Sequence, residues 1–309
     1  MGISLFKHWS PKANAELLMK MTGTNKEDIK EKMSIEEDGA IYIPSTNTLL
    51  TGKDVTTSHY QVKAGTETIA GGAFTYSKVV SIELPESVHS IQERAFRESK
   101  NLVEINIPSK IMEICESTFS ECESLKSIVL PDTCLSIQQM AFYSCKQLEK
   151  VSVNHSAKGA SAQSSEMKAI AQRAFYNCVA LKEVEIPEGV VSIGDSAFCN
   201  CKSLSTILLP SSLESIQKSA FWDCSSLTEL DIPESVREIH TTSMPPALKT
   251  IHLRAKEIKI EKEAFLRCKN IETIFVPQGC TDIFKKIFEG TRDYISTRMK
   301  EGKLQIQEE

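Results

Sequence analysis

One block of residues recurs through most of the chain at a spacing close to 23 residues. The copy that spans residues 125–145 reads Leu-Lys-Ser-Ile-Val-Leu-Pro, then Ile after a short link, then Ala-Phe, then Cys. The next copy begins at Leu148, 23 residues after Leu125. A unit of this length is too small to bury a core alone, so it must stack on its neighbours in a repeat solenoid.

The phenylalanine of the Ala-Phe pair marks each copy. Its successive steps are 22, 23, 23, 33, 23, 23, 23 and 21 residues, where Met244 fills the slot of one degenerate copy. Proline closes the preceding segment in most copies; Asn154 and Arg254 replace it in two. The anchors are Phe74, Phe96, Phe119, Phe142, Phe175, Phe198, Phe221 and Phe265.

Each part of the unit has an expected structure. Leu-x-x-Ile-x-Leu directs alternate side chains inward, as a strand does, and stacked units give a parallel sheet. Proline ends the strand because it lacks the N–H that a ladder needs. Val-x-x-Ile predicts a second short inward segment, and Ala-Phe predicts a tight helical turn with Phe in the core. About ten coils, each rising about 4.8 Å, would make a body roughly 50 Å long.

The pattern Leu-x-x-Ile-x-Leu-Pro-x-x-Val-x-x-Ile-x-x-x-Ala-Phe-x-x-Cys-x-x-Leu is similar to the BspA-type (Treponema-type) leucine-rich repeat over about residues 57–280. The resemblance implies a curved, right-handed solenoid used for binding. Its members in bacteria and protozoa are often surface adhesins or proteins of unassigned role. The expected fold class is therefore α/β and β-rich: a leucine-rich-repeat solenoid with a parallel sheet and helical caps at both ends.

Residues 1–57 do not repeat and are expected to cap the first coil; a separate functional domain is the alternative. Ser10-Pro11 is typical of a helix start, and Thr24 or Asn25 can cap a second helix. Residues 41–43 and 48–50 suggest short strands. The repeats are assigned to residues 58–280.

Residues 281–309 are expected to form a helical C-terminal cap, with partner docking as the alternative. Apolar residues fall at helical spacing, Gly290 interrupts them, and a second helical piece follows from Tyr294. Phe275 either is exposed near this end or packs under the helix. The helical stripe consists of Ile283, Phe284, Ile287 and Phe288.

One copy carries ten extra residues within the segment 154–166. This segment is small and polar, which is typical of a flexible surface loop that either is merely tolerated or contacts a partner. Asn154-His155-Ser156 is also a glycosylation sequon, which has meaning only in a secreted chain.

Six of the ten cysteines stand three residues after the anchor position, and Ser99 takes this place in an early copy. Stacked coils should place these thiols one above another as small buried groups. Cys115, Cys134 and Cys280 fall outside this register and are expected to be free. So many unpaired thiols fit a reducing compartment. The six are Cys122, Cys145, Cys178, Cys201, Cys224 and Cys268.

The sequence offers no motif for chemistry. Paired cysteines at zinc spacing, a His-Glu-x-x-His pair, a Gly-x-Ser-x-Gly elbow and a phosphate loop are all missing, so we expect no cofactor, no metal and no catalysis. The net charge of −5 argues against nucleic-acid binding, which needs a basic stripe. No apolar run is long enough to span a bilayer, and the N-terminus lacks a signal-peptide core.

A binding surface is expected on the concave face of the sheet, where the third and fifth positions of Leu-x-x-Ile-x-Leu point outward. These columns mix acidic groups with exposed apolar side chains, a combination that suits protein binding. The candidate partner-binding residues are Glu104, Asn106, Ser127, Val129, Lys150, Ser152, Glu183, Glu185, Thr206, Leu208, Glu229 and Asp231.

The favoured hypothesis is a non-catalytic, monomeric and cytoplasmic interaction module that binds a protein or peptide on the solenoid. Two alternatives stay open. The first is a secreted or cell-surface adhesin, which the family resemblance implies. The second is an enzyme whose site the sequence does not reveal.

Overall fold

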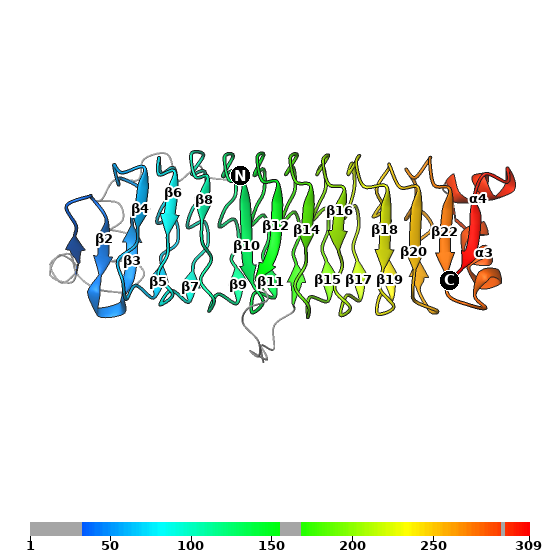
Figure 1. The fold of residues 1–309 in the computed structure, drawn as a ribbon, viewed down its shortest axis with the longest axis horizontal. Helices are drawn as coiled ribbons and strands as arrows, with labels where there is room; N and C mark the ends of the chain where they lie inside the picture. Colours follow the sequence, from blue (N-terminus) through cyan, green and yellow to red (C-terminus); the bar gives the residue numbers. More distant parts are fainter. Residues whose placement is uncertain (1–32, 155–167, 292–293) are drawn as a thin grey trace, which may run out of the picture.

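The chain forms an elongated solenoid in which parallel strands are stacked side by side along the long axis (Figure 1). The computed structural model describes residues 33–154, 168–291 and 294–309. Two series of strands run along the body, one on each side of a continuous apolar core. The architecture predicted from the repeat, a parallel-sheet leucine-rich-repeat solenoid, is confirmed.

The first series arises from Leu-x-x-Ile-x-Leu and is called the major sheet here. Its strands pair in parallel with a register of one coil, in three hydrogen-bonded groups that end at β8, β16 and β23. The repeat strands are β4 (His59–Gln61), β6 (Ser81–Glu83), β8 (Glu104–Ile105), β10 (Ser127–Pro131), β12 (Lys150–Asn154), β14 (Glu183–Glu185), β16 (Thr206–Leu208), β18 (Glu229–Ile232), β20 (Thr250–Leu253) and β22 (Thr273–Val276).

The second series consists of two-residue strands from Val-x-x-Ile and is called the minor sheet. The insertion falls between β12 and β13, yet Ile137 still pairs with Ile170, so the extra residues leave the register of the coils intact. Residues 155–167 lie outside the described residues. The strands are β5 (Thr68–Ile69), β7 (Ser90–Ile91), β9 (Glu113–Ile114), β11 (Ser136–Ile137), β13 (Ala169–Ile170), β15 (Ser192–Ile193), β17 (Ser215–Ile216), β19 (Glu238–Ile239) and β21 (Lys259–Ile260).

The Ala-Phe segment is a run of turns and not the helical turn that the sequence suggested. Its amides alternate between two partners: the Phe175 N–H donates to the carbonyl of Ala197 in the next coil (2.8 Å), whereas the Ala174 N–H donates within its own coil (3.2 Å). Left-handed backbone flanks the turn at Arg173 (φ 56°) and Asn177 (φ 64°). Every second amide is thus shared between coils, which stacks the turns much as a parallel ladder stacks strands.

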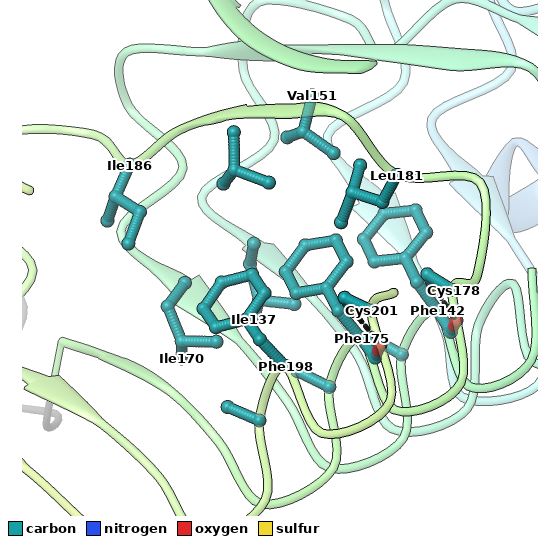
Figure 2. Close-up of a cluster of buried hydrophobic side chains, with 14 of the residues drawn as sticks. Ile137, Phe142, Val151, Ile170, Phe175, Cys178, Leu181, Ile186, Phe198 and Cys201 are labelled. Carbon is teal, nitrogen blue, oxygen red and sulfur yellow. Dashed lines mark hydrogen bonds between the residues drawn. The ribbon is translucent and has the colours of Figure 1, made fainter. Parts of the chain in front are cut away.

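The anchor phenylalanines form a single file through the core, as the spacing predicted (Figure 2). From Phe74 to Phe221 successive rings stack with centroids 5.0–5.7 Å apart and interplanar angles of 12° or less. Met244 is buried in the next slot, and Phe265 meets Phe288 of the C-terminal cap edge-on at 5.9 Å. One apolar column therefore connects the repeats to the cap.

The thiols form a second column beside the rings. None of the ten cysteines, all of which lie in the described residues, forms a disulfide. The Cys178 Sγ–H donates to the carbonyl of Phe142 (3.1 Å) and the Cys201 Sγ–H to that of Phe175 (3.1 Å), as the dashed lines in Figure 2 show. Ser99 makes the equivalent bond, 2.5 Å long, to the carbonyl of Phe74. In these coils the residue three positions after the anchor thus donates a buried hydrogen bond to a backbone carbonyl of the preceding coil. The sequence did not indicate this role.

The N-terminal cap region contains β1 (Ser34–Ile35), β2 (Ile41–Ile43), the short 3-10 helix η1 (Pro44–Thr46) and β3 (Thr48–Thr51). Both predicted strands are present. The three strands run antiparallel, but β3 also pairs in parallel with β5, so the minor sheet already begins before residue 58. The helices predicted near residues 10 and 25 lie outside the described residues.

The C-terminal cap contains α3 (Thr281–Glu289), α4 (Tyr294–Lys300) and β23 (Gln305–Glu308). The helical prediction is confirmed: Phe284 and Phe288 of α3 are fully buried, and Gly290 follows its last residue. The sequence did not predict β23, which adds a parallel strand to β22. The cap is therefore part helix and part sheet.

Replacing Gly194 with alanine should destabilise the solenoid by about 1–3 kcal/mol through overpacking. A Cβ atom there would lie 2.8 Å from the carbonyl carbon of Ala171 and 2.9 Å from backbone atoms of Gln172 and Ile170, and backbone atoms have little room to move. Urea unfolding measures the loss. Gln217→Ala, one coil later at the same position, is the control. If both variants lost the same free energy of unfolding, the close contact between Gly194 and the backbone of the preceding coil would be contradicted.

Candidate interaction surface

The predicted outward columns lie on the solvent side of the major sheet. Strand alternation places Ile128, Val151 and Val184 in the core and their neighbours outside. Ser152 and Glu185 are half-buried, and the other ten candidates are exposed. Those ten are Glu104, Asn106, Ser127, Val129, Lys150, Glu183, Thr206, Leu208, Glu229 and Asp231.

Two of the candidates use their polar atoms to hold neighbouring coils together. The Asn106 side chain accepts from the Leu84 N–H (2.7 Å) and donates to the Leu84 carbonyl (2.8 Å). The Glu185 carboxylate accepts from the Val153 N–H (3.0 Å). These side chains supply hydrogen bonds that a strand backbone would otherwise supply, so they contribute to the platform more than to recognition.

At the centre of the surface Lys150 and Glu183 form an ion pair that is 2.9 Å long. The two residues face each other in the β12–β14 register. Hydrogen bonding to Glu183 raises the pKa of Lys150 above its usual value. Both side chains are more than half exposed, so the pair orients charge on the surface and adds little to stability.

Two large apolar side chains stand out from the major sheet: Val129 on β10 is 51% exposed and Leu208 on β16 is 59% exposed. Both occupy the fifth position of their repeats. The intervening coils present Ser152 and Glu185 in the same column. These two exposed apolar side chains lie on an otherwise polar surface of the sheet. They are the features of this face that can add hydrophobic binding energy.

Acidic groups flank these apolar points. Glu104 lies on β8, towards the N-terminal end, and Glu229 and Asp231 lie on β18, towards the C-terminal end. Asp231 is bound by both ends of the Arg254 guanidinium fork, at 2.9 Å each. The sequence contained one signal for this contact, because Arg254 stands where most copies have proline.

Phe275 is half-buried, and its ring and backbone contact two neighbouring strands of the major sheet. Its ring stacks on His252 with centroids 4.5 Å apart, and its backbone pairs with Gln307 of β23. The half-buried ring thus lies between two strands of the major sheet, and the unpredicted strand explains its environment.

Within residues 33–154, 168–291 and 294–309, no group of three His, Cys, Asp or Glu side chains is placed to hold a metal ion. A search of the same residues finds no helix with the length and apolar character that a membrane crossing requires.

Comparison with known proteins gives a match to one protein family and matches to several solved structures. The profile of the BspA type leucine rich repeat region, with six copies, matches residues 67–167 and 168–296. No curated protein matches the chain.

The solved structures that the chain matches include leucine-rich repeat proteins. One from Bacteroides ovatus is 20% identical, with a TM-score of 0.49, over 90% of this chain and 75% of its own. The Treponema pallidum leucine-rich repeat protein TpLRR is 20% identical, with a TM-score of 0.49, over 73% of this chain and 91% of its own. A leucine-rich cell surface protein from Faecalibacterium prausnitzii is 20% identical, with a TM-score of 0.38, over 82% of this chain and 95% of its own.

The profile covers well over half of the chain, and its repeats coincide with the stacked coils, the phenylalanine file and the thiol column. The chain therefore belongs to the BspA-type leucine-rich repeat family.

Proposed function

We propose that this protein is a non-catalytic interaction module that binds a protein or peptide on the outward face of the major sheet, between β8 and β18. The observation that carries the proposal is the exposure of Val129 and Leu208 on an otherwise polar platform of stacked parallel strands. Burying such points against a partner is favourable, and a platform already ordered loses little entropy on binding.

The surface suits a partner segment that crosses the strands along the solenoid axis. Such a segment would place apolar side chains over Val129 and Leu208 and polar or basic groups near Glu104 and Glu229. Asn106 and Glu185 are expected to contribute indirectly, since their polar atoms already bind the neighbouring coil.

The location that we propose is the cytoplasm. Ten cysteines without a disulfide fit a reducing compartment, where disulfides do not persist. A surface adhesin would use the same face outside the cell, and membership of the family favours that alternative. Fractionation of the native cells distinguishes the two locations.

The test compares partner capture by the full chain and by a Leu208→Asp variant, with capture from the native source followed by mass spectrometry. Burial of a charge in place of an apolar contact should weaken binding at least about tenfold. Met112→Asp is the matched control, since Met112 is 52% exposed but lies outside the major sheet. The proposed surface would be contradicted if the Leu208→Asp and Met112→Asp variants captured the same partners in the same amounts as the parent chain.

A further inference from the structure

The Glu309 carboxylate is held at the C-terminal end of the major sheet by two cationic or hydrogen-bonding side chains. His252 Nδ1 donates to its two oxygens at 2.9 and 3.0 Å, and Arg254 Nη1 lies 2.8 Å from Oε1. Strand β22 lies between β20 and β23 in the sheet. The Glu309 side chain, which follows β23, therefore reaches across β22 to contact His252 on β20 and Arg254 directly after β20. The contact is built from parts of three coils.

The two groups that hold the carboxylate are themselves fixed in place. The Arg254 guanidinium is bound at Nε and Nη2 by Asp231, which leaves Nη1 for the carboxylate. The His252 ring is stacked on Phe275, and its Nε2 lies 3.5 Å from Glu229. A planar guanidinium beside a fixed imidazole is a suitable geometry for recognising a carboxylate.

The contact is also partly shielded from water. The His252 side chain is 17% exposed and the Glu309 side chain 25% exposed, whereas Arg254 is more open. Shielding strengthens a charged hydrogen bond relative to a pair in open solvent. The repeat does not require Arg254, because proline fills this position in most coils, including Pro233 and Pro277. The cationic group is therefore an addition to the scaffold.

We propose that His252 and Arg254 form a binding site for a carboxylate carried on an extended segment, and that Glu309 fills this site in cis. The ligand class follows from the group now in the site: a carboxylate on a strand that pairs with β22. The site shares Asp231 and Glu229 with the margin of the proposed partner surface but uses neither Val129 nor Leu208, so different substitutions test the two proposals.

Chemical rescue tests the site in the full chain. Glu309→Ala removes the carboxylate and should speed amide hydrogen exchange of residues 305–308 by about fivefold, the size expected for a partly shielded ion pair. Propionate should restore slow exchange, whereas propionamide at equal ionic strength should not. In the Glu309→Ala, Arg254→Gln double variant, propionate should have no effect.

Glu301→Ala is the matched control, because it removes the same charge from the same segment and Glu301 forms an exposed ion pair with Lys303 at 2.9 Å. It should leave exchange of residues 305–308 unchanged. The assignment is overturned if Glu309→Ala exchanges like the parent chain, if Glu301→Ala has an equal effect, or if propionate and propionamide act alike.

Discussion

Replacing Phe142 with alanine should lower the free energy of unfolding by about 3–5 kcal/mol. The ring is fully buried and lies between Phe119 at 5.2 Å and Phe175 at 5.0 Å. Removing it loses the transfer energy of the side chain and leaves a cavity that two stacked neighbours cannot close without leaving their own positions. Urea denaturation followed by far-ultraviolet circular dichroism measures the loss.

Tyr143→Ala is the matched control for this substitution. Tyr143 is the next residue in the chain, and its ring stacks on Tyr176, but it is only half-buried on the outer side of the turn. It should therefore cost clearly less than Phe142→Ala. A loss below about 1 kcal/mol for Phe142→Ala would mean that the phenylalanine file does not carry the packing of the coils.

The phenylalanine file was predictable from the sequence because stacking follows from spacing alone. When each coil adds one layer, residues at the same position of successive repeats must lie above one another. The same reasoning placed the thiols of Cys178 and Cys201 in a column and Met244 in the slot of the degenerate copy. The strand periodicity of two likewise sorted Val129 and Leu208 to the outer face.

The details that the sequence did not show depend on contacts without a fixed spacing. The turn around Ala-Phe avoids a helix because half of its amides bond to the next coil, a choice that local sequence does not encode. The strand β23 is short and polar, so its pairing with β22 is set by the neighbouring edge and not by an apolar pattern. For the same reason Asn106 and Glu185 could not be recognised as bonded to a neighbouring coil.

The buried thiol column should make the stability of the protein fall at alkaline pH. Burial away from water raises the pKa of four fully buried thiols far above the ordinary value of about 8.5. In the unfolded chain the same thiols ionise near that ordinary value. Above it the folded state therefore binds more protons than the unfolded state, and stability falls as the pH rises. The four are Cys122, Cys145, Cys201 and Cys224.

Between about pH 9 and pH 10, each such thiol should lower the free energy of unfolding by on the order of 1 kcal/mol, so the four together should lower it by a few kcal/mol. Urea midpoints at a series of pH values measure the slope. Cys201→Ser is the discriminating variant: serine can keep the bond to the Phe175 carbonyl, as Ser99 does with Phe74, but cannot ionise in this range. In this variant, the decrease of the free energy of unfolding with pH should be smaller by the contribution of one thiol. An unchanged slope would show that the thiol column is not the source of the alkaline instability, because the variant removes one titrating group and leaves the hydrogen-bonded column in place.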